Sequence, residues 1–231
     1  MLKITSRIGL PVTETSGIDC LQMCLNKEHF RNYPKEITYQ YNSRGFRDSE
    51  WPDDLSDVTW CIGDSFTAGT GQPYEEIWPK LLEKKTGKRC INLGEDGCSN
   101  DTMALRAQEI CKLYRPKLIV VMWSYLARRR KENRNIHYNE FSHLDDIINF
   151  LKNYNIVNKL SVNTIHSAIP GIFYGHESLF KKFLSKNYIN DIIFYDQIDY
   201  ARDYHHFDIK TSKGVCDLIE KKINNFDKTS K

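Results

Sequence analysis

Three short segments, far apart in the chain, carry residue types that could perform nucleophilic chemistry. Gly63-Asp64-Ser65 ends an apolar run, Gly97 lies in a small-residue loop, and Asp203 and His206 stand three residues apart near the end of the sequence. A serine hydroxyl is a poor nucleophile at neutral pH unless a base lies within hydrogen-bond reach and a third group orients that base. The three segments together contain all of these parts.

Each segment also has a plain structural interpretation. Ser65 could cap a glycine-rich loop, and Gly97 could be a loop glycine with positive φ. The Asp203 and His206 pair could be a polar surface turn, which is the commoner outcome for such a short pattern. In a helical turn, however, the i,i+3 spacing puts both side chains on one side, as a general base and its orienting acid require. His205 is the rival base, but its i,i+2 spacing from Asp203 suits the pairing less well.

Alternating strands and helices must position these segments. Apolar runs predict strands, and Pro79, Gly87, Ser99 or Asn100, Pro116 and Thr211 predict helix starts and stops. We expect strands at 58–63, 89–94, 117–123, 158–165 and 191–198, and helices at 79–87, 99–114, 141–154, 176–186 and 211–223. A further strand is expected at 36–42, followed by a turn in "NSRGFRD" at 42–48.

This alternation predicts an α/β protein with a central, mostly parallel, five-stranded sheet between two layers of helices. Residues 1–55 are expected to form an irregular N-terminal extension packed on a main domain of residues 56–231. In such folds ligands bind outside the carboxyl ends of the strands. Because all three chemical segments follow expected strands, they should meet in one crevice.

The combination resembles the SGNH (GDSL-type) hydrolases. Gly63-Asp64-Ser65-Phe66 resembles the first block of that family, Gly97 in "NLGEDGCSN" the glycine of its second block, and Asp203 with His206 its last block. The resemblance covers about 42–223, and it implies a three-layer, flavodoxin-like α/β/α sandwich. It also implies a nucleophilic Ser65, a basic His206, an orienting Asp203 and an oxyanion donor at Gly97.

One block of the family departs from the pattern. An asparagine should follow the third strand and complete the oxyanion hole, but here the chain reads Val121-Met122-Trp123-Ser124-Tyr125. Ser124 or Asn100 is expected to donate in its place, because a hydroxyl or an amide can both donate. Losing one oxyanion donor typically costs a factor of about 10²–10³ in rate.

A basic run, Arg128 to Lys131, follows the same strand. Such runs are usually solvated loops. The alternative hypothesis is that Arg128 reaches the crevice and pairs with an anionic group of the substrate.

Composition narrows the remaining possibilities. With 33 Lys and Arg against 30 Asp and Glu, the chain has a formal charge of +3, which gives no general attraction for nucleic acid or membranes. The seven cysteines have no regular spacing, so we expect no disulfide framework. No signal peptide, membrane span or metal-ligand spacing is evident, which predicts a soluble, cytoplasmic protein that needs no metal or organic cofactor.

We therefore expect a serine hydrolase that cleaves a carboxylic ester by acyl transfer, with a small-molecule or carbohydrate ester, anionic on one hypothesis, as substrate. The alternative is a catalytically weak member of the same fold that binds a glycan or a partner protein, or serves as a structural module. Residues 1–55 could also be a docking arm to a larger assembly. Nothing in the sequence indicates the oligomeric state.

Overall fold

The computed structural model describes residues 19–131, 134–137, 143–173 and 191–229. Their centre is a four-stranded sheet in the order β2-β1-β3-β6, in which every neighbouring pair is parallel. The elements are α1 (Lys27–Asn32), β1 (Thr59–Gly63), α2 (Ser65–Ala68), the 3-10 helix η1 (Tyr74–Glu76), α3 (Trp78–Thr86), β2 (Cys90–Gly94), α4 (Asn100–Tyr114), β3 (Leu118–Trp123), β4 (Arg128–Lys131), β5 (Arg134–His137), α5 (His143–Asn158), β6 (Asn163–Ala168) and α7 (Ile209–Thr229).

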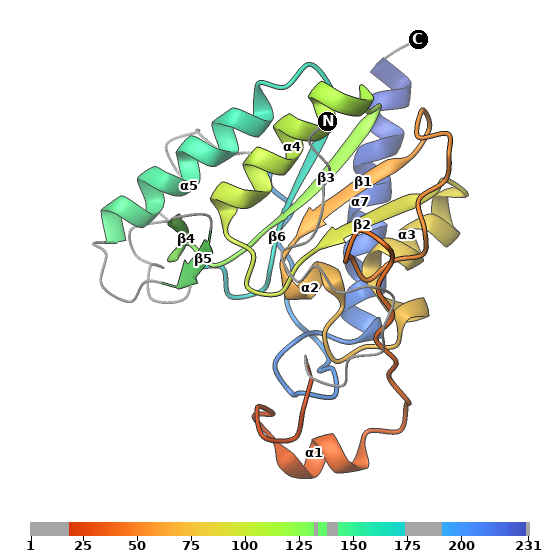
Figure 1. Ribbon diagram of the computed structural model, residues 1–231, viewed down its shortest axis with the longest axis vertical. Helices are drawn as coiled ribbons and strands as arrows, with labels where there is room; N and C mark the ends of the chain where they lie inside the picture. The colour runs from red at the N-terminus through yellow and green to blue at the C-terminus, as the bar shows by residue number, and fades with distance from the viewer. Residues whose placement is uncertain (1–18, 132–133, 138–142, 174–190, 230–231) are drawn as a thin grey trace.

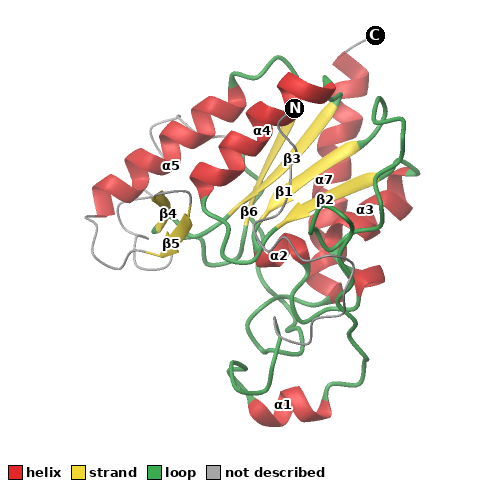
Figure 2. Ribbon diagram, viewed as in Figure 1, coloured by secondary structure: helices red, strands yellow, loops and turns green. Residues whose placement is uncertain are grey.

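Helices cover both faces of this sheet, as Figures 1 and 2 show. Helices α4 and α5 pack together on one face, and α3 and α7 pack together on the other. The chain passes from β1 to β2 in one direction and then crosses back to β3 on the other side of β1. Ligands in open parallel sheets bind at such a reversal, outside the carboxyl ends of the strands. The expected three-layer α/β/α sandwich is therefore present, and its strand order reverses between β1 and β3.

The strands are apolar because both of their faces are covered. Every residue of β1 and β2 is buried, and so are the last five residues of β3. Parallel strands with helices on both sides read as continuous apolar runs, which explains why they were recognisable in the sequence. Trp60 and Trp123 are completely buried among them. All seven cysteines are free thiols.

The expected helix boundaries at α3 and α4 are confirmed. Pro79 lies in the first turn of α3, and Gly87 ends that helix with a left-handed φ of 68°. Ser99, rather than Asn100, caps α4 by accepting a hydrogen bond from the backbone N–H of Thr102. Proline near a helix start and glycine just past its end follow the usual asymmetry of helix termini.

Three expected strands need correction. Residues 191–198 form no regular strand, and only Ile193 makes an isolated parallel bridge, to Ser167 of β6. The described sheet therefore has four strands instead of five. β6 begins at Asn163, because residues up to Asn158 continue α5. Residues 36–42 are extended without a partner strand; their alternation arises because Tyr39 and Tyr41 are both buried. The turn at 42–48 is present, with Gly45 N–H bonded to the carbonyl of Asn42.

The final helix starts earlier than expected. α7 begins at Ile209, and Asp199 accepts hydrogen bonds from the backbone N–H groups of Asp208, Lys210 and Thr211. Thr211 lies in its first turn instead of capping it. The expected helix at 176–186 and residues 1–18, where no signal peptide was expected, lie outside the described residues.

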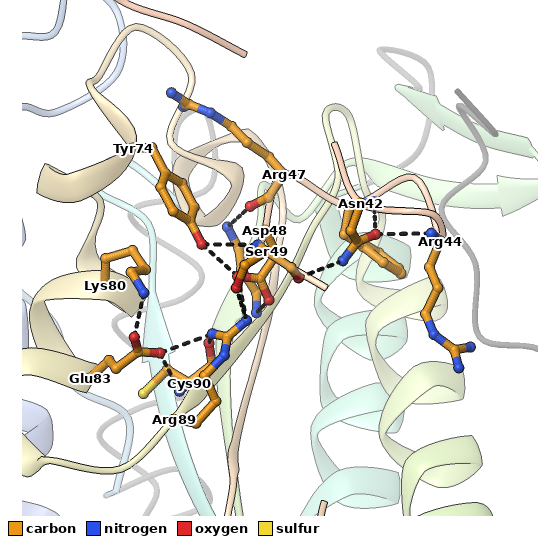
Figure 3. A network of polar contacts seen from close by, with 12 residues as sticks. Asn42, Arg44, Arg47, Asp48, Ser49, Tyr74, Lys80, Glu83, Arg89 and Cys90 are labelled. Atoms are coloured by element: carbon orange, nitrogen blue, oxygen red, sulfur yellow. Dashed lines mark hydrogen bonds and ion pairs between the residues drawn. The ribbon is translucent and has the colours of Figure 1, made fainter. Parts of the chain in front are cut away.

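The buried carboxylate of Asp48 links the segment before the sheet to β2. Asp48 accepts a hydrogen bond from the backbone N–H of Asn92 (3.0 Å) and another from the Tyr74 hydroxyl (2.7 Å), and it pairs with Arg89 (2.8 Å). Figure 3 shows these contacts converging from the N-terminal segment, η1 and β2. Residues 42–50 therefore pack directly against the strand that leads to Gly97.

None of the helices in the described part of the chain combines the length and the apolar character needed to cross a bilayer.

Candidate active site

Ser65 sits at the first residue of α2, directly after β1. Asp64 caps this short helix: its Oδ1 accepts a hydrogen bond from the backbone N–H of Phe66 (3.0 Å). Gly63 is required just before it, because an added Cβ would lie 2.0 Å from the Thr67 hydroxyl oxygen. The small residues of "GDSFTAG" thus allow a sharp strand-to-helix turn that places the serine side chain at the end of the sheet.

His206 lies in the loop before α7 and bridges two of the predicted site residues. Its Nε2 is 2.7 Å from the Ser65 hydroxyl oxygen, and its Nδ1 is 2.5 Å from Oδ2 of Asp203. All three residues are buried. With the proton on Nδ1, the ring donates to Asp203 and can accept the serine proton at Nε2. The structure therefore brings Ser65, His206 and Asp203 together in the order expected from the sequence.

The loop from Ala201 to His206 holds Asp203 in position. The second carboxylate oxygen of Asp203 accepts hydrogen bonds from the backbone N–H groups of His205 and His206, each at 3.0 Å. Tyr204 has a left-handed φ of 58°, an uncommon conformation for a residue with a side chain. The carbonyl of His206 accepts from the N–H of Ala201, which closes the loop. This tight turn, rather than a helix, gives the i,i+3 pair its common side.

The pKa of Asp203 follows from this environment. Burial would raise the pKa of this carboxyl, but the hydrogen bond and charge of His206 and the two backbone N–H groups outweigh it and lower the pKa below its ordinary value. Asp203 is therefore ionised at neutral pH. An ionised carboxylate at Nδ1 fixes the tautomer of the imidazole and stabilises its protonated form.

The rival base, His205, has a different environment. Its ring faces the ring of Phe66 at 5.8 Å and lies edge-on to that of His206 at 4.9 Å. Burial and the neighbouring His206 lower its pKa. His206, not His205, makes the bond to Ser65.

Gly97 lies in the loop between β2 and α4, as expected for an oxyanion donor. It has a left-handed φ of 67°, and an added Cβ would meet no atom within 4 Å. Glycine is thus required there for its conformation and not for space. No described residue accepts a hydrogen bond from the N–H of Gly97, and the same holds for the N–H of Ser65. These two donors remain available for a ligand oxygen.

A buried ion pair that the sequence analysis did not single out holds this loop. Arg106 of α4 pairs with Glu95, and its Nη1 also donates to the carbonyl of Leu93 (3.1 Å). Both charged side chains are almost completely buried. The spacing of Glu95 and Arg106 gives no recognisable motif, so only the structure reveals their connection to Gly97.

The expectation that Ser124 or Asn100 donates in place of the missing asparagine needs correction. The Ser124 hydroxyl donates to Oδ2 of Asp64 (2.5 Å), which uses its single proton. The amide nitrogen of Asn100 donates to the carbonyls of Ser124 (3.1 Å) and Tyr125 (3.4 Å), and its oxygen accepts from the N–H of Ser124 (2.9 Å). Asn100 therefore fixes the end of β3, and neither side chain has a proton left for an oxyanion.

Arg128 reaches the strand ends, as one hypothesis required, but it has a partner within the protein. Its Nη1 donates to Oδ2 of Asp64 (2.7 Å) and to the Ser124 hydroxyl oxygen (2.8 Å). The Arg128 side chain is 15% exposed, whereas that of Asp64 is fully buried. Asp64, which caps α2, thus also carries the charge that holds this arginine.

Arg47 is a further support that the sequence did not reveal. Its buried guanidinium donates to the carbonyls of Gly69 and Gln72 in the loop after Ser65, and to that of Thr38 (3.1 Å). It lies in "NSRGFRD", the segment expected to form a turn at 42–48. Arginine carries five N–H donors in a fixed plane, which suits it to several carbonyls at once.

Solved structures with similar folds include three described as esterases or lipolytic proteins. They are a putative lipolytic protein of the G-D-S-L family from Desulfitobacterium hafniense DCB-2 (TM-score 0.51, 12% identity, 72% of this chain and 99% of that one), the psychrotrophic esterase EstA from Pseudoalteromonas sp. (0.51, 16%, 74% and 98%), and a family two carbohydrate esterase from Clostridium thermocellum in complex with cellohexaose (0.50, 12%, 76% and 66%). The chain has the SGNH (GDSL-type) fold. At these identities the likeness establishes that fold alone. No protein-family model matches the chain, and no curated protein matches it in sequence.

Proposed function

We propose that this SGNH-fold protein is a serine hydrolase that cleaves a carboxylic ester by acyl transfer. The observation that carries the proposal is the continuous chain of hydrogen bonds from the Ser65 hydroxyl through His206 to Asp203. A nucleophile, a base and an orienting acid within hydrogen-bond distance form the constellation that activates serine in hydrolases on unrelated folds.

In the first step, the Ser65 oxygen forms a bond to the ester carbonyl carbon while His206 takes the hydroxyl proton at Nε2. The carbonyl π electrons move to the oxygen, which becomes an oxyanion facing the N–H groups of Ser65 and Gly97. When the intermediate collapses, the bond to the alcohol breaks and His206 gives its proton to the leaving oxygen. Water then attacks the acyl-enzyme by the same route, and Ser65 is restored.

The proposed substrates are esters with short acyl groups, including acyl groups on carbohydrates. A structurally similar protein is a carbohydrate esterase that was crystallised with cellohexaose, which supports testing acylated sugars first. The chemistry requires no metal, because the charge on the oxyanion can be held by N–H donors.

The test is a panel of p-nitrophenyl esters with acetyl, butyryl and octanoyl groups, together with an acetylated cello-oligosaccharide. We expect turnover that is greatest for the acetyl compounds and that is lost in Ser65→Ala, with circular dichroism and Tm unchanged. Equal turnover in wild type and Ser65→Ala would refute the proposal.

A binding or structural module is the second candidate. The observation that favours it is the absence of a free side-chain amide or hydroxyl donor at the end of β3, since Ser124 and Asn100 are already bonded. A module of this kind should show no Ser65-dependent turnover of any ester in the panel, while retaining binding to an oligosaccharide in calorimetry.

A further inference from the structure

The end of β3 has an unusual composition for an oxyanion site, which bears on the proposed function. The Ser124 hydroxyl and the Asn100 amide spend their protons on Asp64 and on backbone carbonyls. Two backbone N–H groups would then hold the oxyanion without a side-chain donor. An additional donor at this position would be worth a factor of about 10²–10³ in rate.

Arg128 is a charged side chain that contacts both Ser124, directly after β3, and Asp64, directly before Ser65. It bonds to Asp64 and Ser124 through Nη1 alone, and its guanidinium also lies over the ring of Tyr125, 5.0 Å from the centroid. No described residue accepts a hydrogen bond from its Nε or Nη2. The side chain is 15% exposed, so these donors are not buried in the core. They are also not bonded elsewhere in the described structure.

The position of Asp64 makes a cation necessary. Its carboxylate is fully buried and belongs to the residue directly before Ser65. When the Ser65 oxygen bonds to a carbonyl carbon, the negative charge that develops on the carbonyl oxygen would be repelled by this carboxylate, and repulsion between like charges is strong where water is excluded. The positive charge of Arg128, held 2.7 Å from Asp64, opposes that repulsion.

We infer that Arg128 is a catalytic residue of the proposed hydrolase and takes the role of the missing asparagine. In the proposed step, an N–H of Nε or Nη2 donates to the oxyanion that forms when the Ser65 oxygen bonds to the carbonyl carbon. Arg128 keeps its protons throughout; the transferred proton is the one that passes from Ser65 to His206. Its positive charge is shared between Asp64 and the oxyanion. The inference depends on the proposed function, since it assigns a role within that reaction.

The first measurement is kcat and KM for p-nitrophenyl acetate, a neutral ester, in wild type, Arg128→Ala and Arg128→Lys. The matched control is Arg130→Ala, which removes an exposed arginine from the same strand. We expect Arg128→Ala to lower kcat by about 10²–10³ with little change in KM, and guanidinium ion to restore part of the loss where ethylammonium does not. Arg130→Ala should stay close to wild type.

A second set of variants separates direct donation from support of Asp64. Asp64→Asn and the double variant Asp64→Asn/Arg128→Ala both lack the buried carboxylate. The double variant therefore has no unpaired buried charge, and it can be measured even if Arg128→Ala alone folds poorly. We expect the double variant to be at least about tenfold slower than Asp64→Asn, because the donor is then lost as well. Equal kcat in these two variants would overturn the inference and make Arg128 a positioning residue.

Other outcomes are equally decisive. Wild-type kcat in Arg128→Ala, with Ser65-dependent turnover intact, would overturn the inference but leave the proposed function standing. A rise in KM confined to a succinyl ester, without loss of kcat on the neutral ester, would make Arg128 a substrate-binding residue instead. Absence of any Ser65-dependent turnover in wild type would refute the proposed function and this inference together.

Discussion

The Nε2 atom of His206 lies 2.7 Å from the hydroxyl oxygen of Ser65, although the two residues stand 141 positions apart in the sequence. The two residues approach from different elements: Ser65 follows the central strand β1, and His206 ends the tight loop before α7. Asp203 completes the line behind the imidazole. This line of three polar side chains is the relationship on which the proposed chemistry depends.

The assignment of His206 as the base can be tested by replacing each of the two neighbouring histidines in turn. His206→Ala should reduce kcat for p-nitrophenyl acetate by at least about 10³, because no other side chain among the described residues is bonded to the Ser65 hydroxyl. His205→Ala should retain most of the activity, since His205 makes no bond to Ser65. Steady-state kinetics with a Tm for each variant checks this. Loss of activity in His205→Ala, with His206→Ala active, would reverse the assignment.

The low pKa of Asp203 predicts a pH dependence of stability. A carboxyl whose folded-state pKa is depressed stabilises the fold above its ordinary value of 3.8, and this contribution is lost as the pH falls through the folded-state pKa. The Tm of wild type should therefore exceed that of Asp203→Asn at pH 7, and the difference should shrink below about pH 4. Thermal melts of both proteins between neutral and acidic pH measure it. The other carboxyls titrate in both proteins, so a difference that stays constant down to pH 3 would contradict the explanation.

The buried pair of Arg106 and Glu95 predicts a large effect on stability. Arg106→Met leaves Glu95 buried without this partner and should lower the free energy of unfolding by about 3–5 kcal/mol. Adding Glu95→Gln should recover a substantial part of the loss. Urea denaturation gives both values. The control is Lys84→Met, which breaks an exposed pair with Glu75 and should cost at most about 1 kcal/mol. Equal costs for Arg106→Met and Lys84→Met would show that burial of the pair has no special weight.

Two glycines near the site should respond differently to alanine. At Gly94 an added Cβ would lie 2.1 Å from the backbone nitrogen of Ala68, so Gly94→Ala should displace α2 or prevent folding. At Gly97 there is space, and only the left-handed φ opposes the change, at a cost of about 1–2 kcal/mol. Gly97→Ala should therefore fold but lose activity, because its N–H shifts. Tm and kcat together test this; a fully active Gly97→Ala would remove Gly97 from the oxyanion site.

Much of the fold could be predicted because its strands are buried on both faces. Continuous apolar runs marked β1, β2 and β3, and Ser99 and Gly87 marked helix ends. Residues 191–198 misled because they have the same composition but lie at the sheet edge, where only Ile193 makes a bridge. The alternation in residues 36–42 arises because Tyr39 and Tyr41 are buried, not because a strand pairs there. Tyr39 packs on the loop after Ser65 and donates a hydrogen bond to Asp19.

The sequence indicated which residues lie near one another where topology decides their position, but not which partners their side chains choose. Ser65 and Gly97 follow β1 and β2, whose carboxyl ends lie at one edge of the parallel sheet, and His206 follows a segment that bridges to β6 at Ile193. The sequence could not reveal that Asn100 would bond the backbone of Ser124, or that Arg128 would pair with Asp64. Such choices depend on distances of a few tenths of an ångström within the crevice, which residue types and spacing do not determine.

Covalent labelling tests the central claim most directly. Wild type, Ser65→Ala and His206→Ala would each be incubated with a fluorophosphonate, and the adduct would be located by mass spectrometry of the intact protein and its peptides. We predict one adduct, on the peptide that contains Ser65, absent from Ser65→Ala and formed far more slowly in His206→Ala. An unlabelled wild-type protein, or an adduct that persists in Ser65→Ala, would contradict it.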